Sequence, residues 1–269
     1  MPDRLERLIA LTRRITARAG EQVSLGALAE GLHAAKSTLS EDVTLVKETL
    51  GRLGLGEVTT QVGAGGGVRF MPALDLVRTK QALDTLADAL AQPDRLIGGG
   101  FLYMTDLLFD PALMDPVGQL LAERLAPGRP QYVATVETKG VPLALSVARW
   151  LTVPVVLIRR DNRLSEGSSL AINYLSGSSH RIQSMSLARR SPVRGARIAY
   201  VDDFLKAGGT ARAAMDLLSE FQAEVSGVGV LVGTAKPAEK LVSGIHACLE
   251  WDEERGVRPA PWAAERLQG

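Results

Sequence analysis

Two adjacent carboxylates, Asp202 and Asp203, stand at the end of a hydrophobic run, and a Gly-Gly-Thr sequence follows them closely. The run over 198–201 predicts a strand, and the amphipathic pattern of 211–221 predicts a helix. Paired carboxylates accept hydrogen bonds from a vicinal diol, whereas backbone N–H groups at a helix N-terminus bind phosphate. A ligand such as ribose 5-phosphate carries both groups on one scaffold. The alternative is a strand that ends at a solvated acidic turn, and the glycine pair argues against it.

A second short segment, Glu137-Thr138-Lys139-Gly140, follows a strand predicted at 132–136. A turn of this kind can bind pyrophosphate through its backbone N–H groups and the lysine ammonium. Arg160, after the strand predicted at 153–158, adds a guanidinium that matches pyrophosphate oxygens. A lysine in a turn is more often simply solvated, so this interpretation depends on the diol-and-phosphate loop in the same sheet.

The elements that must position these residues alternate between strands and helices from about residue 101 onward. Strands are expected at 132–136, 153–158, 197–201 and 224–232, and helices near 111–125, 141–151 and 211–221. This alternation predicts an α/β domain with a parallel sheet, flanked by helices, that binds ligands at the carboxyl ends of its strands. Two further alternating stretches, near 170–174 and 182–187, are interpreted as a hairpin over the site rather than a core element.

The first 70 residues predict a separate helical module that ends in a hairpin. Helices are expected near 4–18, after an N-cap at Ser24 and over 36–50, with strands at 56–61 and 68–71 around a glycine-rich loop. This is the order of a winged helix-turn-helix, whose helix after the turn enters the major groove. Any small helical domain shows similar stripes, so the pattern alone leaves DNA binding open. The candidate DNA contacts are Lys36, Ser37, Thr38, Ser40, Gly65, Gly66 and Arg69. Arg4, Arg7, Arg13 and Arg14 of the first helix are further candidates for phosphate contacts.

Length and composition set the frame for these modules. The chain has 269 residues, 46% of them hydrophobic, and a net charge of +1. It is therefore expected to form two domains, over 1–73 and 74–269, with Pro93 and the run Gly98–Gly100 in the connection between modules. One cysteine and three separated histidines exclude a disulfide framework and a zinc-type site. No apolar run of about 18 residues is present, so a cytoplasmic protein without membrane association is expected.

Several long motifs in one order resemble the purine operon repressors of Gram-positive-type bacteria. They are Gly-Gly-Phe-x-Tyr-x-Thr-Asp at 99–106, Ser-Gly-Ser-Ser-x-Arg-Ile-Gln-x-Met-Ser at 176–186, and Asp-Asp-Phe-x-Lys-Ala-Gly-Gly-Thr at 202–210. The last also resembles the 5-phosphoribosyl 1-pyrophosphate (PRPP) motif of type I phosphoribosyltransferases, which usually have threonine where this chain has Ala207 and a small apolar residue where it has Lys206. The resemblance covers roughly residues 4–250 and implies a winged-helix domain fused to a type I phosphoribosyltransferase-like domain. The tail from Pro259 resembles nothing informative.

The resemblance also implies a function. It implies a homodimeric repressor of purine biosynthesis and transport genes that binds double-stranded operator DNA. PRPP would release this repressor from the DNA, and the protein would transfer no phosphoribosyl group. Guanosine tetraphosphate (ppGpp) is implied as a competing ligand that favours repression. No catalytic residue and no resident metal are implied, since magnesium would arrive with PRPP.

Ligand roles follow by position in the matching motifs. Asp202 and Asp203 would hold the ribose diol, and residues Lys206, Ala207, Gly208, Gly209 and Thr210 would bind the 5′-phosphate. Phe204 and Tyr103 would flank a purine ring, while Thr138, Lys139, Gly140 and Arg160 would meet pyrophosphate.

Two other functions stay open at this point. The first is a purine or xanthine phosphoribosyltransferase with an added N-terminal domain, which release of pyrophosphate from PRPP and a base would reveal. The second is a PRPP sensor that controls a protein partner instead of DNA. The sequence does not decide whether PRPP would act allosterically or compete directly with DNA.

Overall fold

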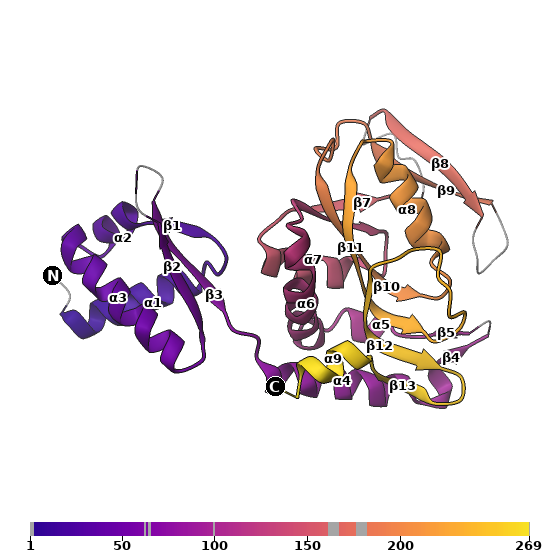
Figure 1. Cartoon of the computed structure of the whole chain (residues 1–269), viewed down its shortest axis with the longest axis horizontal. Coiled ribbons are helices and arrows are strands. Elements are labelled where there is room, and N and C mark those ends of the chain that lie inside the picture. Colours follow the sequence, from indigo (N-terminus) through magenta and orange to yellow (C-terminus); the bar gives the residue numbers. More distant parts are fainter. Residues whose placement is uncertain are drawn as a thin grey trace. The chain divides into compact units, whose positions relative to one another are not determined.

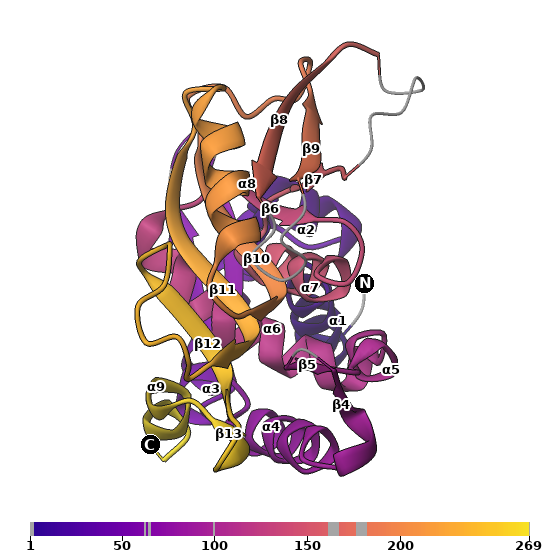
Figure 2. The ribbon, with the colours of Figure 1, turned by 90° about the vertical axis from the view of Figure 1, so that its right-hand side faces the viewer.

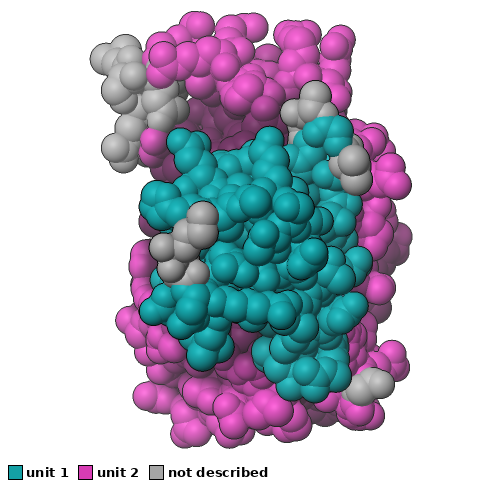
Figure 3. Space-filling view, turned by 90° about the vertical axis from the view of Figure 1, so that its left-hand side faces the viewer, with its two compact units in different colours: residues 1–74 teal, residues 75–269 magenta. Residues whose placement is uncertain are grey.

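The computed structural model describes residues 3–61, 63, 66–98, 100–160, 167–175 and 182–268. The chain forms two compact units, residues 1–74 and 75–269, which Figure 3 colours separately. The division lies one residue beyond the boundary expected from the sequence. Each unit is described by itself below.

The N-terminal unit has the winged-helix order. Its elements are α1 (Arg4–Thr16), β1 (Gln22–Ser24), α2 (Leu25–Gly31), α3 (Lys36–Arg52), β2 (Gly56–Gln61) and β3 (Gly67–Pro72). The strands form an antiparallel sheet in the order β1-β3-β2. Its core includes Leu11 and Ile15 of α1 with Leu39 and Val43 of α3, at the helical spacing that the sequence shows. The Ser24 hydroxyl accepts a hydrogen bond from the N–H of Ala27, which confirms the expected N-cap. The short strand β1 was not expected.

The arginines of α1 are partly engaged inside this unit. Asp42 of α3 is only 1% exposed, and the Arg7 guanidinium donates to it at 2.5 Å, with Arg4 at 3.6 Å. Arg14 donates to the Gly31 carbonyl at 2.7 Å and so satisfies the end of α2. The buried carboxylate of Asp42 needs a cationic partner of the kind that Arg7 provides. Arg4, Arg7 and Arg14 therefore have structural contacts, which the sequence-based interpretation as phosphate contacts did not include.

The C-terminal unit is built on a six-stranded sheet. Its helices are α4 (Leu76–Leu90), α5 (Thr105–Leu108), α6 (Pro111–Leu125), α7 (Val141–Leu151), α8 (Gly209–Ser219) and α9 (Pro261–Arg266). Its strands are β4 (Leu96–Ile97), β5 (Phe101–Leu102), β6 (Tyr132–Val136), β7 (Val155–Ile158), β8 (Ser169–Leu175), β9 (Ile182–Ala188), β10 (Arg197–Leu205), β11 (Glu224–Thr234), β12 (Ile245–Asp252) and β13 (Gly256–Pro259). The sheet order is β13-β12-β11-β10-β6-β7, parallel except for the antiparallel edge strand β13.

Helices cover both faces of this sheet, as the alternating sequence predicts (Figure 1). Because successive residues of a strand point to opposite faces, Val228 and Val230 of β11 pack with α8. Gly227 and Gly229 instead lie against Leu125 and Leu121 of α6. The parallel sheet thus carries the carboxyl ends of β6, β7, β10 and β11 to one edge, where sites form in such folds.

The β8–β9 hairpin is more than an excursion over the site. It pairs antiparallel from Ser169↔Ala188 to Leu175↔Ile182 and packs against α8 (Figure 2). Met185 and Leu187 are 0% and 4% exposed and belong to the same core cluster as α8. The sequence-based interpretation was therefore incomplete, because the inward-facing residues of β9 contribute to the core.

Two segments differ from what the sequence indicated. Gly98 and Gly100, expected in the connection between modules, are turn residues between β4 and β5 inside the C-terminal unit. The tail from Pro259 forms α9, and the Trp262 indole N–H donates to the Ala247 carbonyl of β12 at 2.6 Å. Within the described residues, no helix is both long and apolar enough to span a bilayer.

Candidate functional site

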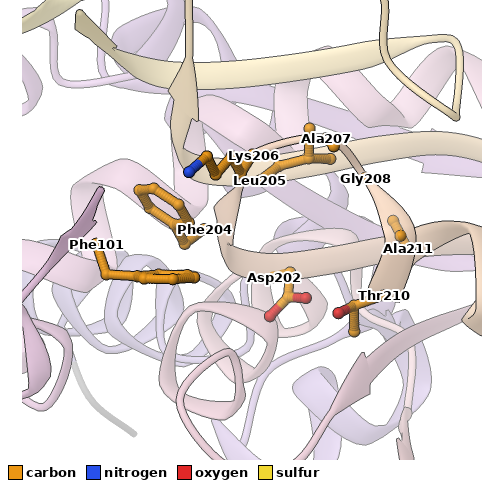
Figure 4. Close-up of a pocket in the computed structure, with 10 residues that line it drawn as sticks. Phe101, Asp202, Phe204, Leu205, Lys206, Ala207, Gly208, Thr210 and Ala211 are labelled. Carbon is orange, nitrogen blue, oxygen red and sulfur yellow. The ribbon is translucent and has the colours of Figure 1, made fainter. Parts of the chain in front are cut away.

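An open pocket of about 120 Å³ lies where β10 ends and α8 begins (Figure 4). The lining residues are Phe101, Asp202, Phe204, Leu205, Lys206, Ala207, Gly208, Gly209, Thr210 and Ala211. The structure thus brings the Asp202 carboxylate, the glycine loop and the first turn of α8 around one cavity. This is the strand-loop-helix arrangement that the sequence predicts, with an acid and an anion-binding loop side by side.

Both acids lie within β10, whereas the sequence placed them in the loop after it. β10 continues to Leu205 because β11 keeps pairing with it, with Phe204 opposite Val232 and Leu205 opposite Gly233. The two-residue period of a strand puts Asp202 and Phe204 on the same face. Both line the pocket, and Asp203 does not. By the same period the side chain of Asp203, which is partly buried, lies on the opposite face of β10.

The Asp202 carboxyl is buried and has two donors inside the unit. The Tyr200 hydroxyl donates to its Oδ2 at 2.7 Å and the Asp203 N–H donates to its Oδ1 at 3.0 Å. Burial raises the pKa of Asp202 well above its usual range, and the charge of Asp203 raises it further, while the Tyr200 hydroxyl opposes the rise. Tyr200 is fully buried, so sequence reasoning took it for a core residue and missed this contact.

The loop after β10 presents backbone donors. Gly208 is the N-cap residue of α8 with φ 87°, a left-handed conformation that glycine adopts without strain. The first N–H groups of α8 have no acceptor within the helix, and the helix dipole adds positive potential there. Figure 4 shows Ala207, Gly208 and Thr210 in sequence along this rim of the pocket. The loop and helix can therefore bind an anion such as a phosphate.

Two phenylalanine rings and a lysine form the other side of the pocket. The ring centroids of Phe101 and Phe204 lie 5.7 Å apart at 44°, and the Lys206 ammonium lies 5.8 Å from the Phe101 centroid. Phe101 comes from β5, which the glycine turn places beside the pocket. Aromatic faces of this kind suit a planar ring, with the ammonium close to any anionic group that the ring carries.

Tyr103, expected to flank a purine ring, is not among the residues that line the pocket. Its side chain is 46% exposed, and the Arg95 guanidinium lies 5.9 Å from its ring centroid. β5 ends at Leu102, so the two-residue period that would put Phe101 and Tyr103 on one face does not continue. The structure gives the pocket Phe101 instead, an aromatic residue directly after the glycine run.

The second predicted segment lies next to Asp202. A Cβ placed on Gly140 would come 2.8 Å from the Asp202 Oδ1 and 2.5 Å from the buried Thr135 Oγ1. Thr138 and Lys139 are exposed just before it, and the Glu137–Thr138 peptide bond is cis. Glu137 accepts hydrogen bonds from the Arg159 guanidinium at 3.0 Å and from the Arg160 N–H at 2.9 Å. The ends of β6, β7 and β10 therefore meet at one site.

The DNA-contact candidates lie on the N-terminal unit. Lys36, Ser37 and Ser40 are exposed at the start of α3, Thr38 is half-buried, and Arg69 is exposed on β3. A Cβ on Gly26 of α2 would come 3.9 Å from the Lys36 ammonium, so that lysine reaches toward the start of α2. Gly66 belongs to the turn between β2 and β3, and Gly65 lies outside the described residues. No group of His, Cys, Asp or Glu side chains in the described ranges of either unit is arranged to hold a metal.

Comparisons with known proteins match both units. Residues 3–72 match the family described as "Bacterial purine repressor, N-terminal", and residues 105–258 match the "Phosphoribosyl transferase domain". The adenine phosphoribosyltransferase of Saccharomyces cerevisiae shares the C-terminal fold, with a TM-score of 0.51 and 18% identity over 61% of this chain and 98% of that one.

Two curated relatives span both units. The purine biosynthesis transcriptional repressor PurR of Bacillus subtilis (strain 168) is 44% identical over 88% of this chain and 83% of its own. The purine biosynthesis transcriptional activator PurR of Lactococcus lactis subsp. lactis is 35% identical, over 93% and 92% respectively. The winged-helix unit, the phosphoribosyltransferase-type unit and these relatives together show that the chain belongs to the purine repressor family of bacterial transcriptional regulators of purine biosynthesis.

Proposed function

We propose that this chain represses purine biosynthesis and transport genes in the cytoplasm by binding operator DNA as a homodimer, and that PRPP releases it from the DNA. The observation that carries the proposal is the pocket at β10 and α8, which joins a buried carboxylate to a phosphate-sized loop in a chain that also has a winged-helix unit. The 44% identity to a repressor supports repression over activation as the direction of control.

In the proposed complex, the ribose diol, the 5′-phosphate and the pyrophosphate of PRPP each contact a different group of residues. The carboxylates of Asp202 and Asp203 accept the ribose hydroxyls, and the residues Lys206–Thr210 donate to the 5′-phosphate. The pyrophosphate, with its magnesium, meets Thr138, Lys139 and Gly140 next to Asp202 and the exposed side chain of Arg160. ppGpp is proposed as a competitor in the same pocket, its purine ring against Phe101 and Phe204 and its phosphates on the loop.

Release from DNA is a linkage between two sites. PRPP must bind the arrangement that is incompetent for DNA more tightly than the competent one, and typical couplings are about 1–3 kcal/mol. Alternatively, the PRPP phosphates and the DNA backbone could compete directly for the same basic side chains. PRPP would lower the affinity for DNA in this case as well. In either case DNA affinity should fall steeply with salt, because phosphate contacts release counterions.

Fluorescence anisotropy with duplex DNA from upstream of a purine gene tests the proposal. Tight binding that magnesium-PRPP weakens, and that ppGpp restores by competition, supports it. Binding that PRPP strengthens would mean activation, and sedimentation of the protein on its operator reports the dimer. We further propose that no transfer occurs, and pyrophosphate release from PRPP in the presence of adenine, guanine, hypoxanthine or xanthine would instead establish an enzyme.

We expect Lys36→Ala to weaken operator binding by about 1 kcal/mol and to reduce the salt dependence by about one ion, because an exposed lysine at the start of the recognition helix neutralises a phosphate. PRPP affinity should not change, since Lys36 is in the other unit. Anisotropy titrations at several salt concentrations measure both quantities. Lys80→Ala is the control, since Lys80 has a 61% exposed side chain on α4 in the C-terminal unit. If the two variants bound the operator with equal affinity, the prediction that α3 contacts DNA would be wrong.

We expect Tyr200→Phe to make PRPP affinity fall at a higher pH than in the wild type. The ionised Asp202 is the form that accepts from the diol, so affinity declines as the pH drops through its pKa. That pKa is already raised by burial, and the Tyr200 hydroxyl opposes the rise, so its removal moves the decline further up the pH scale. Calorimetric titrations between about pH 5 and pH 8 measure the shift. Tyr174→Phe, whose hydroxyl bonds Gln183 instead, should leave the profile in place.

A further inference from the structure

Lys240, in the segment between β11 and β12, holds the backbone of the loop that precedes α8. Its half-buried ammonium donates to the Lys206 carbonyl at 2.5 Å, to the Thr234 carbonyl at 2.8 Å and to the Thr234 hydroxyl at 3.0 Å. Its neighbour Leu241 donates its backbone N–H to the Ala207 carbonyl at 2.9 Å. Two successive carbonyls of the loop are thus fixed from the same segment, although Lys240 does not line the pocket.

These contacts set the direction of the loop's N–H groups. The peptide bonds after Lys206 and Ala207 are trans, and in a trans peptide the N–H points opposite to the C=O. Holding the carbonyls of Lys206 and Ala207 toward Lys240 and Leu241 therefore turns the N–H groups of Ala207 and Gly208 away from that segment. Both residues line the pocket, and neither N–H donates to any other group in the described part of the chain. These two donors are therefore available to an anion in the pocket.

The next residue of the segment supports the same geometry. Val242 is 9% exposed, and a Cβ on Gly208 would lie 3.3 Å from its Cγ2 methyl group. Gly208 keeps φ at 87°, the conformation in which the loop enters α8. Residues 240–242 thus contact 206, 207 and 208 in turn, at matched positions.

We propose that Lys240 is a positioning residue for phosphate binding: it orients the N–H groups of Ala207 and Gly208 toward the 5′-phosphate without touching the ligand. The inference rests on the proposed function, because it assumes an effector that carries this phosphate. A hydrogen bond to a charged group contributes enough that misaligning two donors should weaken binding by about 10- to 100-fold.

The test compares three variants by calorimetry with magnesium-PRPP, ribose 5-phosphate and pyrophosphate as separate probes. Lys240→Met keeps the aliphatic stem and removes the donors, and it should lose about 10-fold or more in affinity for PRPP and ribose 5-phosphate. Lys240→Arg keeps a cation with several donors and should recover most of that loss. Lys236→Met is the matched control, since the Lys236 side chain is 75% exposed and its ammonium lies 3.6 Å from the exposed carboxylate of Glu254. Pyrophosphate, held at the other end of the site, should bind all three variants alike.

A structural defect would give a different pattern from loss of positioning. Nuclear magnetic resonance of the full chain should show the amide signals of Ala207 and Gly208 moved in Lys240→Met, with operator affinity and thermal midpoint close to the wild-type values. An unchanged affinity for ribose 5-phosphate in Lys240→Met overturns the inference and leaves PRPP control intact. If the wild type binds ribose 5-phosphate but not PRPP, and Lys240→Met loses that binding, the proposed function fails and the positioning role stands. If the wild type binds none of the three probes, both are wrong.

Discussion

Asp203→Ala is expected to abolish the response of operator binding to PRPP and leave a protein that stays on its DNA. The variant removes a carboxylate that accepts from the ribose diol, and two charge-assisted hydrogen bonds are together worth about 3–6 kcal/mol. PRPP affinity should therefore fall by more than about 100-fold. Operator affinity should stay near the wild-type value, because the candidate DNA contacts lie in the N-terminal unit.

The electrostatics of the site make this variant informative. The charge of Asp203 raises the pKa of Asp202, so its removal lowers that pKa and favours the ionised form of Asp202. Loss of binding then reports the missing acceptor and not protonation of its neighbour. The Asp203 N–H to Asp202 bond is a backbone contact and survives the substitution.

Anisotropy titrations of operator DNA against increasing magnesium-PRPP measure the response. Asp216→Ala is the control, since Asp216 is an exposed acid on α8 whose carboxylate pairs with Arg212 of the same helix at 3.0 Å. If the Asp203→Ala variant left operator DNA at the PRPP concentrations that release the wild type, the proposed contact between Asp203 and the ribose diol would be wrong. Loss of operator binding without PRPP would show that Asp203 has a structural role.

The sequence predicted the main elements because their residues repeat at the period of the element they form. The helices at 111–125 and 141–151 and the strand at 132–136 have the bounds that the pattern gave. β4, β5 and β13 are two to four residues long, too short for any period to show, and β12 went unpredicted because its strand lies beyond the last alternation considered. Pairing with a neighbour, and not local pattern, decides where such strands form.

The site was predictable where short contiguous segments carry it. Asp202 and the loop to Thr210 are contiguous, so their types and spacing already indicated a diol and a phosphate. Phe101, Tyr200 and Lys240 join the site from β5, from inside β10 and from the segment before β12, and each has an ordinary local context. Residues of these types come into contact with the site only through the way the chain folds. Long-range contacts of this kind leave no spacing signal in a single sequence.

Gly140 connects the two halves of the site, and Gly140→Ala is expected to disrupt both stability and PRPP binding. Its new Cβ would meet the Asp202 Oδ1 at 2.8 Å and the Thr135 Oγ1 at 2.5 Å, closer than any real contact. Thr135 is fully buried and Asp202 is 8% exposed, so neither can move aside freely. Overpacking of this kind costs about 1–3 kcal/mol. A rotated Asp202 would also leave the Tyr200 hydroxyl, so PRPP affinity should fall by about 10-fold or more.

Chemical denaturation and calorimetry with magnesium-PRPP separate the two effects. Gly98→Ala is the control, because a Cβ there meets nothing within 4 Å and the residue has no positive φ. Thr135 Oγ1 has no hydrogen-bond partner among the described residues, so Thr135→Ala can relieve the crowding at little cost. The double variant Thr135→Ala with Gly140→Ala should therefore regain stability but remain weak for PRPP, since the contact with Asp202 persists. Full recovery of PRPP affinity in the double variant would mean that Gly140 acts on the core alone and not through Asp202.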